Sequence, residues 1–213
     1  MKNKPWSGRG LYAITDRNLL PHDQLPRKVG EAIAGGACLV QYRDKGSDED
    51  RRRQEASMLI PLCHRHAVPL IINDDIDLAY ETGADGVHLG IEDDSLERAR
   101  ARLGNDAIIG VSCYNRLDRA IRAADAGADY VAFGRFFPSR TKPGAIKADI
   151  GLLQEARKRL SLPIAVIGGI SPENALPLVE AGADLLAVID GVFGQEDPRR
   201  AAGQFTRLFR ETG

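Results

Sequence analysis

Gly83-Ala84-Asp85-Gly86-Val87 is one of four similar segments, and their spacing decides the fold. The others are Gly36-Ala37-Cys38-Leu39-Val40, Gly127-Ala128-Asp129-Tyr130-Val131 and Gly182-Ala183-Asp184-Leu185-Leu186. Each follows a helix-like stretch and opens an apolar run, where glycine suits the left-handed backbone that ends a helix. The first glycines lie 47, 44 and 55 residues apart (36 to 83, 83 to 127, 127 to 182), about the length of two strand–helix units. Four such pairs predict eight strands, the number that closes a (β/α)₈ barrel.

The apolar runs themselves support this interpretation. They are rich in valine, isoleucine and leucine, as buried parallel strands are, and helix-like stretches such as residues 118–126, 150–160 and 174–181 separate them. The alternation predicts one α/β domain over residues 1–213, a (β/α)₈ TIM barrel, although Pro61 interrupts the second helix pattern. The expected strands are Gly10–Thr15, Cys38–Arg43, Leu70–Asn73, Gly86–Leu89, Ile108–Ser112, Tyr130–Gly134, Ile164–Gly168 and Leu185–Ile189.

A doubly wound open sheet is the alternative architecture. That fold normally places a glycine-rich phosphate turn after its first strand. Here Asp16-Arg17-Asn18 follows the first apolar run, and it contains no glycine. The barrel is therefore the favoured prediction.

The bulk composition limits the kinds of partner. The 213 residues carry a formal net charge of −1, so we expect no nucleic-acid or membrane partner, and an anionic small-molecule substrate would need a local cluster of donors. Residues 1–6 lack the apolar run of a signal peptide, and no apolar stretch is long enough to predict a membrane span. Three widely spaced cysteines fit neither a disulfide framework nor a zinc site, which favours a reducing cytoplasm.

Barrel active sites lie where the strands end, so the residues at those ends are the candidates. The second run ends in Gln41-Tyr42-Arg43-Asp44-Lys45. If the strand persists that far, its period of two directs Gln41, Arg43 and Lys45 to one side. A guanidinium fork and an ammonium point charge are both suited to phosphate oxygens.

Two acidic clusters end the third and fourth runs. They are Asn73-Asp74-Asp75 and Gly90-Ile91-Glu92-Asp93-Asp94. Neighbouring carboxylates make a site for a hard cation such as Mg²⁺ plausible. Asp75 and Asp94 stand immediately before helical stretches and suit helix caps, which leaves Asp74 and Asp93 as the better metal candidates.

The later strand ends suggest anion binding. Residues 134–144 form a loop with two hydroxyl groups and three cations that suits an anion site or lid, and the sequence leaves open whether residues 135–147 close over substrate. Gly168-Gly169 and Ile189-Asp190-Gly191 follow the seventh and eighth runs, where barrels often bind phosphate through backbone N–H groups. Cys113 has no evident base around it in sequence, and His88, inside the fourth run, favours a structural role over catalysis.

Taken together, these motifs resemble the thiamine phosphate synthase family over nearly the whole chain, starting at Gly10-Leu11-Tyr12-Ala13-Ile14-Thr15-Asp16. Members of this family are transferases that join a pyrimidine pyrophosphate to a phosphorylated thiazole. The matching motifs are Gln41 to Lys45, Asn73-Asp74, Gly86 to Gly90, Gly110-Val111-Ser112, the loop from Gly134 to Lys142, and Ile167 to Ile170.

The resemblance implies a role for each matching position. The pyrimidine pyrophosphate would contact Gln41, Arg43, Lys45, Asn73, Ser112 and Lys142. The thiazole phosphate would contact Ser139, Thr141, and backbone N–H groups near Gly169 and at Ile189-Asp190. Asp74 and Asp93 would bind one Mg²⁺ per subunit. Arg43, Lys45, Lys142 and the metal would stabilise the departing pyrophosphate, after which the thiazole nitrogen attacks the pyrimidine cation.

Two positions depart from the family pattern. Ile91 replaces a usual glutamine near the metal loop, and Asp190 replaces a usual uncharged residue at the end of the eighth run. Because a carboxylate beside phosphate would repel it, we expect the Asp190 side chain to turn away and cap the next helix.

Two other functions remain as alternatives. A thiazole tautomerase-like barrel would not need the cation trio and both acidic clusters together. A non-catalytic thiamine phosphate-binding barrel would be expected to carry an extra interaction segment, which the sequence lacks. The oligomeric state stays open.

Overall fold

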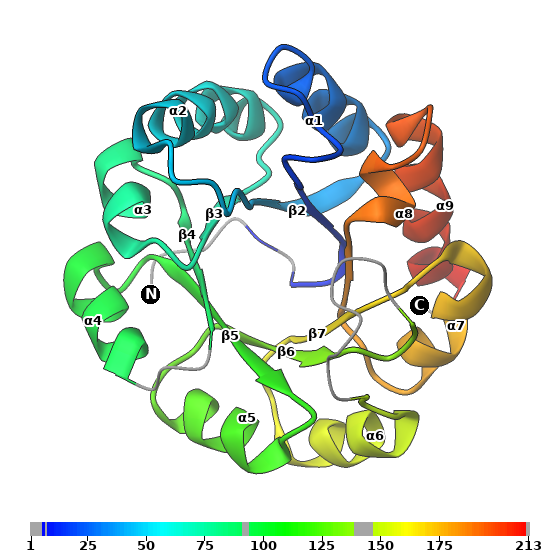
Figure 1. Cartoon of the computed structure of the whole chain (residues 1–213). Coiled ribbons are helices and arrows are strands. Elements are labelled where there is room, and N and C mark those ends of the chain that lie inside the picture. The colour runs from blue at the N-terminus through cyan, green and yellow to red at the C-terminus, as the bar shows by residue number, and fades with distance from the viewer. Residues whose placement is uncertain (1–5, 7, 91–93, 139–146, 212–213) are drawn as a thin grey trace.

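The computed structural model describes residues 6, 8–90, 94–138 and 147–211. Its strands close into a parallel barrel in the order β1-β2-β3-β4-β5-β6-β7-β8, with β8 pairing back to β1 and the helices outside (Figure 1). The strands are β1 Gly10–Ile14, β2 Ala37–Tyr42, β3 Leu70–Asn73, β4 Gly86–Leu89, β5 Ile108–Tyr114, β6 Tyr130–Gly134, β7 Ile164–Ile167 and β8 Leu185–Val188. The predicted (β/α)₈ barrel is confirmed, and each strand end lies within two residues of its predicted position.

The helices follow the strands in alternation. They are α1 Leu25–Ala34, α2 Glu49–Arg65, α3 Ile76–Thr82, α4 Asp94–Leu103, α5 Leu117–Asp125, α6 Ile150–Arg159, α7 Pro172–Glu180, α8 Asp190–Phe193 and α9 Pro198–Glu211. Pro61 lies inside α2 and does not end it. Leu59 and Cys63 on either side of it are fully buried, and this packing holds the helix together despite the hydrogen bond that proline cannot donate.

The Gly-Ala-Asp repeat has a structural role at the start of alternate strands. Gly83, Gly127 and Gly182 all have positive φ, which confirms the helix-ending role. The aspartates share one contact: Oδ2 of Asp85, Asp129 and Asp184 accepts a hydrogen bond, at 2.8 Å each, from the backbone N–H of Leu70, Ile109 and Ile164, respectively. Each aspartate thereby fixes its own strand beside a neighbouring strand.

A basic side chain from a covering helix completes each of these contacts. His64 of α2, Arg100 of α4 and Arg157 of α6 pair with Asp85, Asp129 and Asp184 at 2.9, 2.9 and 2.7 Å. The repeat therefore joins three elements at once: two strands and the helix outside them.

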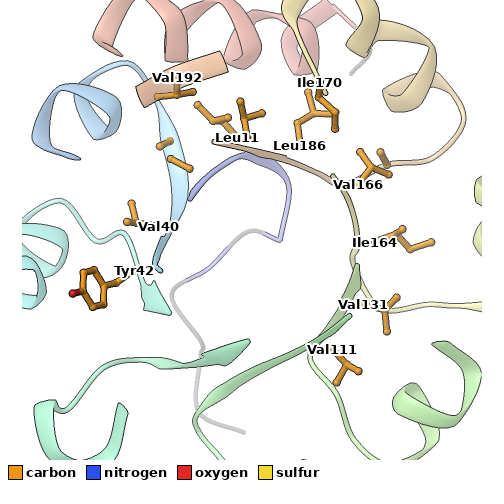
Figure 2. Close-up of a cluster of buried hydrophobic side chains, with 14 of the residues drawn as sticks. Leu11, Val40, Tyr42, Val111, Val131, Ile164, Val166, Ile170, Leu186 and Val192 are labelled. Carbon is orange, nitrogen blue, oxygen red and sulfur yellow. The ribbon is translucent and has the colours of Figure 1, made fainter. Parts of the chain in front are cut away.

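Alternate residues of each strand enter two separate cores. Outward-facing side chains such as Leu11, Val40, Val131 and Leu186 pack in the layer between strands and helices (Figure 2). Inward-facing side chains such as Tyr12, Leu39, Ile71 and Tyr130 fill the barrel, and Trp6 packs against this inner cluster. The interior of the barrel is therefore a packed core over the described residues, and in such barrels ligands bind at the ends of the strands.

No helix of the described residues combines the length and the apolar character that crossing a membrane requires.

Candidate active site

A cavity of about 640 Å³ opens at the carboxyl ends of the strands. Six of the predicted site residues line it: Gln41, Arg43, Asn73, Ser112, Gly169 and Ile189. They come from β2, β3 and β5 and from the segments directly after β2, β7 and β8. The volume lies in the range of small-molecule sites, about 300–1,000 Å³. The barrel thus brings together residues that are up to 148 positions apart in the chain (41 to 189).

Gln41 and Arg43 face the cavity from the end of β2, as the period of two predicts. The Arg43 side chain is largely buried, with 16% of its area exposed, and its Nη1 lies 3.1 Å from Oδ2 of Asp16. The backbone N–H of Arg43 donates to the Thr15 hydroxyl oxygen at 2.9 Å. The end of β1 therefore fixes both the backbone and the guanidinium of Arg43, which leaves a preorganised cation at the cavity wall.

Lys45 and Asp74 lie beside the cavity and are not part of its lining. β2 ends at Tyr42, so the strand does not continue to Lys45 as the prediction required. Lys45 Nζ instead forms an ion pair with Asp74, and Asn73 Nδ2 donates to Asp74 Oδ2 at 2.9 Å. Asp75, the next residue, caps α3 by accepting from Leu78 N at 2.9 Å, as predicted.

Ser112 faces the cavity next to His88. His88 Nε2 lies 2.9 Å from Ser112 Oγ. Cys113 points the other way and is fully buried, and burial raises the pKa of its thiol to about 12. A thiol with so high a pKa is not a nucleophile at neutral pH, in agreement with the sequence prediction.

The double glycine after β7 forms the opposite wall. Gly168 and Gly169 have φ of +106° and +63°, in the left-handed region. A Cβ atom at Gly168 would overlap Arg135, and one at Gly169 would overlap the Pro138 carbonyl. Only glycine fits here, because the segment after β6 packs directly against this backbone.

Comparison with known proteins identifies the family. The model of the family described as "Thiamine monophosphate synthase" matches residues 11–192. The chain belongs to this family. Its relatives include a thiamine-phosphate synthase of Nitrosococcus oceani, 58% identical over 94% of this chain and 93% of that one. One of Thiobacillus denitrificans is 52% identical over 94% of both chains. The solved structure of a Pyrococcus furiosus thiamine phosphate pyrophosphorylase superposes with a TM-score of 0.85, at 34% identity, over 96% of both chains.

Asp190 lies just after the end of β8, where the sequence departs from the family pattern. The prediction that its side chain caps α8 is wrong. Ile189 occupies the N-cap position and Asp190 is the first helical residue, without a side-chain cap hydrogen bond. A Cβ atom on Gly194 would overlap Asp190 Oδ1, so the carboxylate lies along the short helix beside Gly194. The helix begins one residue earlier than a capping role for Asp190 requires.

We therefore expect Asp190→Ala to change the free energy of unfolding by less than about 0.5 kcal/mol, the usual range for an exposed side chain without a special contact. Asp75→Ala is the matched control, since its carboxylate does cap a helix and its loss should cost about 0.5–2 kcal/mol. Chemical denaturation of both variants would measure the difference. Equal losses in the two variants would contradict this placement of Asp190.

Four predicted site residues of the family pattern lie outside the described residues. They are Asp93, Ser139, Thr141 and Lys142, and the same holds for Ile91. Three further residues at the site were given no site role by the sequence analysis, which assigned His88 a structural role. Tyr12 and His88 line the cavity and Tyr130 lies directly beneath them. Their signal in the sequence was present but weak: each is a polar side chain at an inward position of a strand otherwise filled by apolar residues.

Proposed function

We propose that this chain condenses a pyrimidine pyrophosphate with a phosphorylated thiazole to give thiamine phosphate and pyrophosphate, the activity for which its relatives are named. The observation that carries the proposal is the composition of the cavity. Arg43, Asn73 and Ser112 offer cationic and neutral donors from one side, and the Gly168-Gly169 backbone approaches from the other. Two separate anionic groups could therefore be held in one cavity, which suits a reaction between two phosphorylated substrates.

The chemistry requires no nucleophilic side chain. The bond between the pyrimidine methylene carbon and the pyrophosphate oxygen breaks, and its electron pair leaves with the oxygen. The thiazole nitrogen then forms the new C–N bond with its lone pair. Arg43 and Ser112 would stabilise the charge that develops on the departing pyrophosphate, while Gln41 and Asn73 would orient the pyrimidine end.

A Mg²⁺ ion fits the residues at the end of β3. Asp74 is 45% exposed in its side chain, and its Oδ1 faces Gly90 at the end of β4, 3.7 Å from where a Cβ atom there would lie. Within the described residues no three His, Cys, Asp or Glu side chains form a metal cluster. Mg²⁺ commonly takes one or two carboxylates and completes its shell with substrate phosphate and water, so Asp74 with Asp93 would suffice. When bound, the ion would neutralise charge on the pyrophosphate.

A reducing cytoplasm is the proposed compartment. Cys38, Cys63 and Cys113 are all free thiols. Small-molecule substrates are the proposed ligands, in keeping with a cavity of this size.

Turnover with purified chain, both substrates and Mg²⁺ tests the proposal. We expect thiamine phosphate and pyrophosphate to form in equal amounts and neither to form when one substrate is omitted. A tautomerase would move protons on a thiazole substrate without the pyrimidine. A binding protein would retain thiamine phosphate and release no pyrophosphate, and either result would refute the proposed activity.

The metal site gives a second test. Asp74→Asn should raise the Mg²⁺ concentration for half-maximal rate by about tenfold or more, because losing even an outer partner of a metal ligand costs about 10–100-fold in affinity. Asp77→Asn is the control, since this exposed carboxylate pairs with Arg98 on the barrel exterior and should leave the Mg²⁺ dependence unchanged. Thermal unfolding would verify that both variants keep the fold. Full turnover in excess chelator would contradict the proposed Mg²⁺ site.

A further inference from the structure

A chain of hydrogen bonds crosses the inside of the barrel beneath the cavity. Gln41 Nε2 donates to the Tyr12 hydroxyl, which lies 2.7 Å from the Tyr130 hydroxyl. The Tyr130 hydroxyl lies 2.9 Å from His88 Nδ1, and His88 Nε2 lies 2.9 Å from Ser112 Oγ. Five strands contribute one residue each. The residues at the two ends of this hydrogen-bond chain, Gln41 and Ser112, both line the cavity.

The rings in this chain are held by packing as well as by hydrogen bonds. Tyr12 and Tyr130 are 1% and 0% exposed and meet edge to face, with centroids 5.8 Å apart. The His88 ring stacks on Tyr130 at 5.6 Å. Gly110 on the neighbouring strand makes room, because a Cβ atom there would overlap the Tyr130 ring. The chain is therefore a rigid feature of the barrel interior.

The hydrogen bonds all donate in one direction, from Gln41 toward Ser112. An amide N–H can only donate, so the Tyr12 oxygen accepts from Gln41 and the Tyr12 proton is directed to Tyr130. Burial raises the pKa of both phenols, so each keeps its proton at neutral pH. Tyr130 then donates to His88 Nδ1, and the proton of the neutral imidazole lies on Nε2 and is donated to Ser112 Oγ.

The opposite direction leaves a donor without an acceptor. If Tyr130 donated to Tyr12, the Tyr12 oxygen would accept two hydrogen bonds. Its own proton would then have no acceptor among the described residues, in a side chain only 1% exposed. An unsatisfied buried hydroxyl is costly, so the direction that ends at Ser112 is favoured.

We propose that His88 is a positioning residue that makes Ser112 a hydrogen-bond donor toward the pyrophosphate of the pyrimidine substrate, with Gln41, Tyr12 and Tyr130 fixing the tautomer of His88. Because Ser112 Oγ already accepts a hydrogen bond from His88 Nε2–H, its own hydroxyl proton is directed into the cavity. Reversal of the chain would present an acceptor oxygen to an anion and oppose binding. This inference rests on the proposed function, which supplies the anion.

The tautomer can be measured without turnover. Nitrogen-15 NMR of labelled protein should show His88 as a neutral imidazole protonated on Nε2. Tyr130→Phe keeps the ring and removes the hydroxyl, and it should increase the population protonated on Nδ1. If His88 in the wild-type protein were protonated on Nδ1, the proposed direction of the hydrogen bonds would be wrong, whatever the catalytic activity of the protein.

Two amide substitutions separate the two ring nitrogens. In His88→Gln the longer amide reaches the position of Nε2 and can still donate to Ser112. In His88→Asn the shorter amide reaches the position of Nδ1 and loses Ser112. We expect kcat to fall about tenfold or more in His88→Asn, in line with the loss of an oriented donor to a developing oxyanion, and less than about threefold in His88→Gln. The KM for thiazole phosphate should stay unchanged in both. His66→Asn, an exposed histidine at the end of α2, is the control without effect.

A double-mutant cycle with Ser112→Ala completes the test. If His88 acts through Ser112, His88→Asn should slow the Ser112→Ala variant by less than about twofold. If the rate losses of His88→Asn and Ser112→Ala multiply in the double variant, the role of His88 is merely structural and the inference is wrong. Equal rate losses in His88→Asn and His88→Gln would contradict it as well. If His88→Asn does not fold, Tyr130→Phe replaces it in the same cycle with the same criterion. An inactive wild-type chain with the expected His88 tautomer would refute the proposed function alone.

Discussion

Arg43→Ala is expected to lower kcat/KM for the pyrimidine pyrophosphate by well over tenfold. The guanidinium lines the cavity and is held by Asp16 at 3.1 Å, so it meets the substrate already oriented. A charge-assisted contact of this kind contributes about 1.5–3 kcal/mol, and about 1.4 kcal/mol corresponds to tenfold. The loss also uncovers Asp16, a carboxylate only 8% exposed, whose negative charge would then oppose the pyrophosphate. Steady-state kinetics with subsaturating pyrimidine substrate would measure the effect.

Three further variants make this result specific. Arg43→Lys keeps the charge and loses the fork, so it should fall between wild type and Arg43→Ala. Asp16→Asn in the Arg43→Ala background should recover part of the rate, because it removes the uncovered charge. Arg53→Ala removes an exposed arginine paired with Glu81 on the barrel exterior and should not change the rate. A loss below threefold in Arg43→Ala would count against the role assigned to Arg43.

The strands could be predicted from the sequence because each carries its own signal. The apolar runs gave every strand within two residues, and Gly36, Gly83, Gly127 and Gly182 marked where helices end. Pro61 was the misleading residue, since a local rule against proline is overridden by the buried side chains on either side of it.

The site could be predicted where it follows directly from the strand period. Gln41 and Arg43 face the cavity because they continue the inward positions of β2. Lys45 is outside the lining because the strand stops at Tyr42, and a strand end is a matter of pairing with the neighbouring strands. The prediction for Asp190 was wrong for a similar reason. The role of its side chain depends on where a four-residue helix starts, and sequence patterns place such a boundary only to within a few residues.

The contacts across the barrel interior could not be predicted from one sequence. Tyr12 and Tyr130 are 118 positions apart and belong to β1 and β6, which are not paired in the sheet. Only closure of the barrel brings their hydroxyl groups together. Local patterns identify which face a side chain occupies, but the partner across the interior depends on the stagger of all the strands.

The Gly-Ala-Asp repeat gives the largest expected effect on stability. Asp129→Ala should lower the free energy of unfolding by about 2–4 kcal/mol, because it leaves the N–H of the fully buried Ile109 without its acceptor and removes the ion pair with Arg100. For a chain of this size, that corresponds to a fall in Tm of about 4–16 °C. Differential scanning calorimetry or thermal circular dichroism would measure it.

The repeat also supplies its own controls. Asp184 makes the same two contacts, to Ile164 N and Arg157, so Asp184→Ala should cost about as much as Asp129→Ala. Asp129→Asn keeps an acceptor for Ile109 and loses the charge, and its loss should be smaller than that of Asp129→Ala. Asp125→Ala removes an exposed carboxylate at the end of α5 and should be close to neutral. If Asp129→Ala were as stable as Asp125→Ala, the aspartates would not fix the strands, and the repeat would owe its pattern to the glycines alone.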